Sequence, residues 1–152
     1  MADIIGGRIK SGTIVGPDIA TTADILCESM RHAFKAGTNL GFAIGATPTT
    51  REELVYVASG AGVVKGFHAL CLDTGTSSSV TFDLKKNGTT VLSSVITITH
   101  ATTDAQTQDG TLSGIPTLVA GDRLTIAMTV SSSTGMVGPY AFVTVQETSS
   151  PV

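Results

Sequence analysis

The fold is decided by the sequence VTFDLKKNGTTVLSS, residues 80–94. Its first part alternates, with apolar residues at positions 80, 82 and 84 and polar residues at 81, 83 and 85. A period of two is typical of a β-strand that buries one face. Asn87-Gly88 follows, and both residues tolerate the positive φ angles of a two-residue hairpin turn. The stretch therefore predicts a hairpin, with one strand over 79–86 and a return strand over 91–99.

Similar strand signals lie on both sides of this hairpin, at a spacing of roughly 8–12 residues. Residues 124–130 alternate in the same way, and residues 63–72 are nearly continuously apolar. Seven or eight antiparallel strands joined by turn residues predict an all-β sandwich or jelly roll. An immunoglobulin fold is disfavoured because the chain has no Trp. The remaining strands are expected over 53–58, over 110–119 as one or two short strands around Pro116, and over 139–148.

The first 50 residues form a less regular segment. Glycines at 6, 7, 12 and 16 and Pro17 interrupt it. One short helix is expected near 22–36, capped at Thr22 and ended by Gly37. We therefore divide the chain into an N-terminal arm, 1–50, and a β-sandwich domain, 51–152. The arm carries apolar residues that it cannot bury alone, so we expect it to pack on another molecule; the alternative is that it covers an open edge of its own domain.

The composition restricts the partners of this chain. It has 152 residues, a net charge of −3 and only 14% charged residues. No basic excess exists to drive electrostatic binding to nucleic acid or to an anionic membrane, and Lys85-Lys86 is expected to be a solvated pair beside the hairpin turn. No apolar run approaches the length of a membrane span, and the start does not have the pattern of a signal peptide. We therefore expect synthesis in the cytoplasm.

The residues that commonly carry chemistry are few and scattered. His32, His68 and His100 do not have metal-ligand spacing, and Cys27 and Cys71 are expected to be free, mostly buried thiols. His68 and Cys71 are expected on opposite faces of one strand, which argues against a nucleophilic dyad. We assign no catalytic, cofactor-binding or metal-binding residue, and we expect the protein not to be an enzyme.

Several sequence phrases resemble those of tailed-bacteriophage structural proteins. They are the hairpin stretch 80–94, then GTLSG (110–114) and LVAGDRLTI (118–126), which are similar to strand-and-turn segments of those proteins. GRIKSGTI (7–14) and PDIATTADI (17–25) resemble repeats of trimeric phage fibre shafts. The chain is similar to capsid decoration (cement) proteins with a jelly-roll domain, a group related to the tip modules of head and tail fibres.

The resemblance implies a homotrimer on the outside of the virion that binds the major capsid protein and stabilises the head, without a cofactor. The expected capsid contacts are the apolar and basic residues of the arm, namely Ile4, Ile5, Arg8, Ile9, Lys10, Ile14, Val15 and Ile19. A second hypothesis is a head- or tail-fibre module that binds a host receptor through the loops Asp73 to Ser79 and Thr102 to Gly110. A third is an enzyme or small-ligand module built on a jelly roll.

Overall fold

The computed structural model describes residues 31–40 and 43–148 of the chain. This part of the chain consists of strands and loops, and no helix occurs within it. Accordingly, none of the described residues belongs to a helix long and apolar enough to cross a membrane. The strands are β1 (Arg31–Thr38), β2 (Arg51–Val57), β3 (Gly62–Asp73), β4 (Ser77–Lys86), β5 (Thr89–Thr90), β6 (Leu92–Ser94), β7 (Ile96–Thr99), β8 (Gln108–Leu112), β9 (Thr117–Leu118), β10 (Arg123–Thr134) and β11 (Val137–Thr148).

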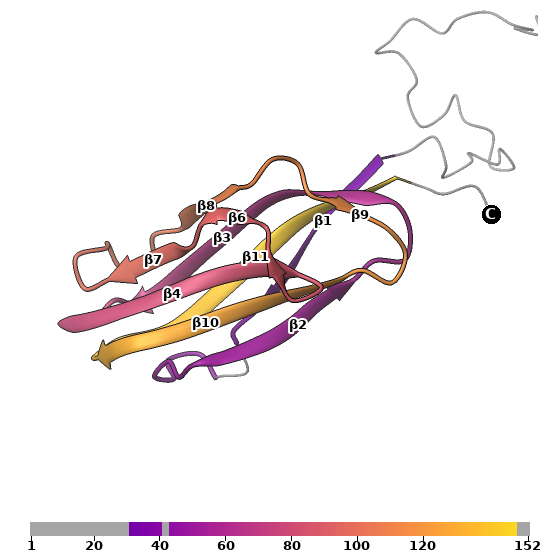
Figure 1. Ribbon diagram of the computed structural model, residues 1–152. Helices are drawn as coiled ribbons and strands as arrows, with labels where there is room; N and C mark the ends of the chain where they lie inside the picture. Colours follow the sequence, from indigo (N-terminus) through magenta and orange to yellow (C-terminus); the bar gives the residue numbers. More distant parts are fainter. Residues whose placement is uncertain (1–30, 41–42, 149–152) are drawn as a thin grey trace, which may run out of the picture.

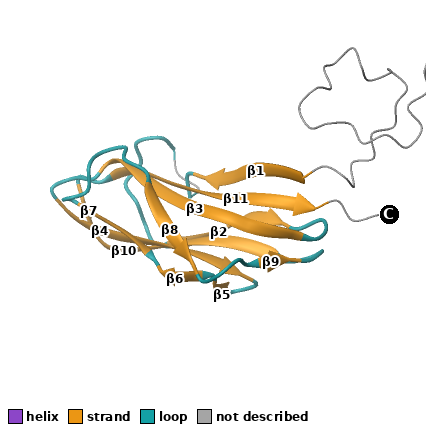
Figure 2. Ribbon diagram, turned by 90° about the horizontal axis from the view of Figure 1, so that it is seen from above, coloured by secondary structure: helices purple, strands orange, loops and turns teal. Residues whose placement is uncertain are grey.

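The strands form two antiparallel sheets that pack face to face (Figures 1 and 2). One sheet, which we call the β3 sheet, has the order β1-β11-β3-β8-β6, and β9 also pairs with β3. The other, the β4 sheet, has the order β2-β10-β4-β5, and β7 also pairs with β4. The shape is therefore a sandwich of two layers.

Eight of these strands follow the order of a jelly roll. Strands β1, β3, β8 and β11 lie in one sheet and β2, β4, β7 and β10 in the other, so most connections cross between the sheets. The other strands, β5, β6 and β9, are two or three residues long and extend this frame. The predicted antiparallel β-sandwich of seven or eight main strands is confirmed.

The helix predicted near 22–36 is wrong over residues 31–36, which belong to β1. This strand pairs with β11 over eight residues, from Arg31↔Thr148 to Thr38↔Ala141. A long antiparallel ladder overrides the weak local preference for helix, because it satisfies the backbone groups along the whole strand. The structure thus places residues 31–38, which the sequence assigned to the arm, in the β3 sheet. Residues 22–30 of the predicted helix lie outside the described residues.

Gly37 was expected to end that helix, but it has a packing role inside β1. A Cβ at this position would lie 2.4 Å from the hydroxyl oxygen of Tyr140 on the neighbouring strand. The missing side chain therefore makes room for the Tyr140 ring. A glycine within a strand often marks such a close approach.

The predicted hairpin at Asn87-Gly88 is confirmed. Both residues have positive φ angles, 50° and 86°, and Lys86 pairs with Thr89 across the turn. The return segment, predicted as one strand over 91–99, is instead divided between the two sheets. Strands β5 and β7 pair with β4, whereas β6 pairs with β8 of the β3 sheet.

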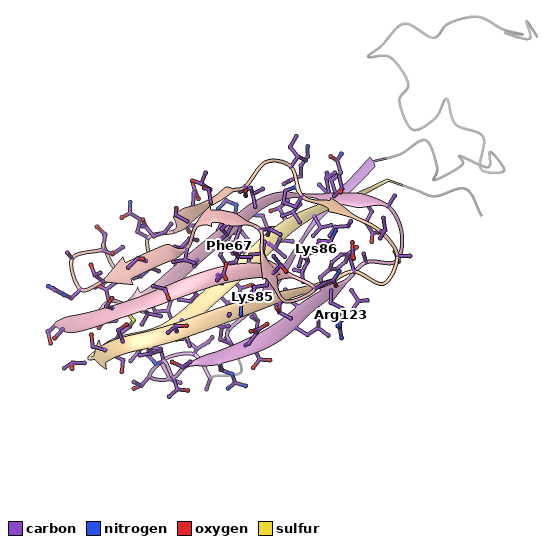
Figure 3. All side chains as sticks on the ribbon, in the orientation of Figure 1. Phe67, Lys85, Lys86 and Arg123 are labelled. Atoms are coloured by element: carbon purple, nitrogen blue, oxygen red, sulfur yellow. The ribbon has the colours of Figure 1, made fainter. Side chains whose placement is uncertain are left out.

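The core lies between the two sheets and follows the predicted alternation. Val80, Phe82 and Leu84 of β4 are fully buried, and their polar neighbours face outward. Phe67, labelled in Figure 3, is also fully buried and comes from the opposite sheet. The core is completed by buried side chains of β10 and β11, namely Leu124, Ile126, Met128, Ala141, Val143 and Val145.

Candidate functional site

The eight predicted capsid-contact residues, between Ile4 and Ile19, lie outside the described residues. Their role stays a prediction. The structure does show where the described chain begins and ends. Arg31 at the start of β1 pairs with Thr148 at the end of β11, so both ends of the described chain lie at the same end of the sandwich (Figure 1). We call this the terminal end.

Four loops gather at the opposite end, which we call the loop end (Figure 1). They connect β1 to β2, β3 to β4, β7 to β8 and β10 to β11, and each joins one sheet to the other. Hydrogen bonds tie three of them together or to a neighbouring strand. The Thr76 N–H donates to the Thr134 carbonyl oxygen at 3.0 Å, and the Gly138 N–H donates to the Ala46 carbonyl oxygen at 2.9 Å.

The two loops that the second hypothesis singled out, Asp73 to Ser79 and Thr102 to Gly110, lie side by side at this end. Thr74 links them, although the sequence did not suggest a role for it. Its N–H donates to Asp104 Oδ1 at 2.8 Å, and its Oγ1 lies 2.8 Å from both Asp104 Oδ1 and the Thr102 carbonyl oxygen. Thr74 is only 3% exposed, whereas Asp104 is exposed, so the link joins a buried side chain to the surface. The bonds from the Thr74 N–H and hydroxyl hold the pKa of Asp104 below its usual value.

The loop end is rich in small polar residues and poor in positive charge. The four connecting segments contain neither Lys nor Arg; Asp104 lies in the β7–β8 segment, and Asp73 is the last residue of β3. Asp73 Oδ1 accepts a hydrogen bond from the Gly75 N–H at 2.7 Å. This surface fits a neutral polar partner better than an anionic one.

The outer face of the β3 sheet carries an aromatic cluster. The ring of His68 stacks on Phe142 with centroids 4.8 Å apart, and its Nδ1 lies 2.7 Å from Asp109 Oδ1. Lys35 comes from β1, the other neighbour of β11, and its Nζ lies 4.8 Å from the centroid of the Phe142 ring. His68 faces away from buried Cys71, as predicted. The pair therefore has no geometry for a nucleophilic dyad.

A cavity of about 280 Å³ lies beside this cluster, toward the loop end. Leu72, Pro139 and Tyr140 line it together with Ile44, which is 86% exposed. The lining is mostly apolar, and its polar residues are Asn39 and Tyr140; it contains no His, Cys, Asp or Glu. His100 lies in the β7–β8 loop, away from this cluster, and the side chain of His32 is outside what the structure describes.

Cys71 is 1% exposed, as predicted for a buried thiol, and its burial raises the pKa to about 12. Such a thiol is a poor nucleophile at neutral pH. Within residues 31–40 and 43–148, no group of three or more His, Cys, Asp or Glu side chains is placed to hold a metal ion. Cys27 lies outside these residues.

The two lysines before the hairpin turn each form an ion pair. Lys85 Nζ bonds Glu52 Oε2 at 2.9 Å, and Lys86 Nζ lies 3.0 Å from Asp122 Oδ2. Figure 3 shows both lysines near Arg123. Both lysines remain partly exposed, as expected for solvated side chains, but each is also paired with a carboxylate, which the sequence did not predict. Pairing with the carboxylates lowers the net positive charge that the two lysines contribute to this surface.

A solved capsid structure contains a chain of similar fold. It belongs to the cyanophage Pam1 capsid asymmetric unit and matches with a TM-score of 0.51 and 17% sequence identity. The match covers 93% of this chain and 97% of that chain, so the two chains have nearly equal lengths. At this identity the likeness shows the fold alone. No protein-family model matches the chain, and no curated protein matches it significantly.

Proposed function

We propose that this protein is a virion structural protein of a tailed phage. In detail, it is a trimeric decoration or cement protein that binds the major capsid protein on the outside of the head. The observation that carries the proposal is the jelly-roll fold shared with a capsid chain of nearly the same length. The phage-like sequence phrases support it independently of the fold.

The two ends of the sandwich fit this role. The arm residues precede β1, which starts at the terminal end, so in this proposal the terminal end faces the capsid and the loop end faces outward. The apolar residues Ile4, Ile5, Ile9, Ile14, Val15 and Ile19 would supply buried area on the capsid, and Arg8 and Lys10 would pair with acidic capsid groups. The reaction with the capsid is association, and no catalytic step is required.

Deletion of residues 1–30 tests the arm directly. The cut must stop before Arg31, because β1 pairs along its whole length with β11 and Leu40 is fully buried in the core. We expect the shortened protein to fold and to melt cooperatively, but not to bind undecorated capsids in a co-sedimentation assay. A folded, truncated protein that still decorates capsids would exclude the arm as the contact.

Two full-length variants with substitutions in the arm refine this test. Replacing the six apolar arm residues with Ser removes the apolar contact, whereas Arg8→Ala with Lys10→Ala removes only the charges. We expect the first variant to lose binding at any salt concentration. The second is expected to bind more weakly, with a reduced dependence of binding on salt.

The copy number in purified virions separates this proposal from the fibre hypothesis. A copy number close to that of the major capsid protein supports a decoration protein. A much smaller number supports a head- or tail-fibre module. That second candidate is favoured by one observation, the close association of the loops Asp73 to Ser79 and Thr102 to Gly110 at one end of the sandwich.

The fibre hypothesis predicts that the exposed loop residues bind a host receptor. Thr103→Ala with Gln106→Ala changes exposed side chains and leaves the Thr74–Asp104 link in place. Loss of cell-surface binding by this variant, with unchanged thermal stability, would support the fibre module over the decoration protein.

A further inference from the structure

The side-chain amide of Asn87 is held at both ends. Its Oδ1 accepts a hydrogen bond from the Arg123 N–H at 2.9 Å, and its Nδ2 donates to Asp122 Oδ1 at 2.6 Å. The Asn87 N–H also donates to the Arg123 carbonyl oxygen at 2.9 Å. The orientation of the amide follows from chemistry, because a backbone N–H only donates and an ionised carboxylate only accepts. These bonds fasten the β4–β5 turn to the start of β10.

Asp122 is the centre of this arrangement. Its Oδ2 accepts from the Val119 N–H at 2.9 Å and lies 3.0 Å from Lys86 Nζ. The bond from the Val119 N–H, followed by those from Lys86 and Asn87, holds the pKa of Asp122 at about 2. The residue is only 7% exposed. At neutral pH, Asn87 therefore faces a fixed negative charge that is shielded from water.

The sequence Asn-Gly has a well-known intrinsic reactivity. The backbone nitrogen of the glycine attacks the side-chain carbonyl carbon of the asparagine, a new C–N bond forms, and the bond to the side-chain nitrogen breaks. The side-chain nitrogen takes up the proton of the attacking N–H and leaves as ammonia. Water then opens the cyclic imide to give aspartate or isoaspartate. The attack requires the asparagine side chain to swing onto the nitrogen of the next residue.

We propose that Asn87 is a site of spontaneous deamidation whose rate is set by Asp122. In the intact fold, the two bonds to the amide keep its carbonyl carbon away from the Gly88 nitrogen. Reaction then occurs only when the turn opens locally. Asp122 is a positioning residue in this scheme, because it acts through the conformation of Asn87.

The product cannot rebuild the bond that held the amide. A carboxylate at position 87 is only an acceptor, and it would face Asp122 Oδ1 across the 2.6 Å that the amide hydrogen bond now spans. Two ionised carboxylates at this distance repel each other, so the bond to Asp122 is not re-formed and the turn is held to β10 only by its bonds to the Arg123 backbone. Deamidation is therefore a one-way loosening of the terminal end. This inference does not depend on the proposed function.

Peptide mass spectrometry of protein aged at mildly alkaline pH measures the rate. The reference is a synthetic peptide of residues 80–94, in which the turn is not held. We expect Asn87 in the intact protein to react roughly tenfold more slowly than in the peptide, or slower, because the reactive conformer is rarely populated. Equal rates in the two would overturn the proposal.

Asp122→Ala removes the acceptor for the amide and is expected to bring the rate close to that of the peptide. Lys86→Ala is the matched control, because it also removes a partner of Asp122 but leaves both bonds to the Asn87 amide. Equal acceleration by the two variants would mean that general destabilisation controls the reaction. If Asp122→Ala does not fold, Asp122→Leu replaces it, since leucine has the branched shape of aspartate but offers no acceptor to the Asn87 amide.

A second experiment tests the product. Asn87→Asp imitates the deamidated chain and is expected to melt at a lower temperature than the wild type. Combining Asn87→Asp with Asp122→Asn exchanges the amide and the carboxylate, so the hydrogen bond re-forms with reversed direction. We expect the double variant to recover part of the lost stability. No recovery would show that the two carboxylates do not clash, which would overturn the one-way loosening.

Discussion

The loop end depends on a close contact between two glycine-containing turns. Gly75, in the β3–β4 loop, has a φ of +71°. A Cβ at this position would lie 2.3 Å from the Thr134 carbonyl oxygen and 2.5 Å from the Met136 nitrogen. Both contacts are with backbone atoms of the β10–β11 turn, which cannot rotate away as a side chain would. Gly75→Ala therefore forces the two turns apart.

Two contributions set the size of the effect. An alanine in the left-handed region costs about 1–2 kcal/mol relative to glycine. Moving the β10–β11 turn adds about 1–3 kcal/mol for an overpacked site, and it strains the bond between the Thr76 N–H and the Thr134 carbonyl oxygen. We expect Gly75→Ala to lower the free energy of unfolding by roughly 2–5 kcal/mol in total.

Gly114→Ala is the matched control. Gly114 has a similar φ of +83°, but a Cβ there would meet nothing within 4 Å. This variant should carry only the conformational cost, about 1–2 kcal/mol. Urea unfolding followed by circular dichroism measures both variants against the wild type. If Gly75→Ala and Gly114→Ala lower the free energy of unfolding equally, the two turns at the loop end accommodate the added Cβ without strain, and the predicted clash between them is refuted.

Three further predictions concern the core, the carboxylates and the thiol. Phe82→Ala is expected to cost about 3–5 kcal/mol in urea unfolding, because it empties a fully buried site, whereas Thr81→Ala on the outer face is expected to change stability by less than about 0.5 kcal/mol. The folded pKa of Asp122 is about 2, below the unfolded value near 3.9. The ionised carboxylate therefore stabilises the fold above about pH 4, and this contribution is lost as the pH falls toward 2. Thermal melts across this range should show a smaller acid dependence for Asp122→Asn than for the wild type. In a Cys27→Ser background, Cys71 should not react with a thiol reagent until urea unfolds the chain, and fast labelling of the folded protein would contradict its burial.

The β4 hairpin shows what the sequence predicts well. Its period-two pattern and the Asn87-Gly88 turn are local features, and local sequence determines both. The same holds for the alternating strand β10 and for the buried face of β3 that carries Phe67 and Cys71. Where one face of a strand is fully buried, the apolar pattern fixes which side chains point inward.

The strand β1 shows what local sequence does not predict. Its pairing partner β11 lies more than 100 residues away, and the residues from Arg31 onward carry a pattern that also suits a short helix. Tertiary pairing decided between the two structures. The division of residues 91–99 has the same origin, because β6 pairs with β8 in the opposite sheet. The hydrogen bonds that hold the Asn87 amide are likewise not predictable from local sequence, because Asp122 is 35 residues further along the chain.

The separation of the two ends follows from the topology itself. In this jelly roll the first and last main strands, β1 and β11, are antiparallel neighbours, so the chain enters and leaves at one end. The four loops that follow β1, β3, β7 and β10 must then lie at the other end. Strand β3 has 12 residues, which corresponds to roughly 40 Å between the ends. If the arm binds the capsid at the terminal end, as proposed, substitutions in the arm and in the loops share no contacts, and their effects on capsid binding and on receptor binding should be additive. Non-additive effects in a combined arm and loop variant would mean that another copy of the chain brings one end against the other.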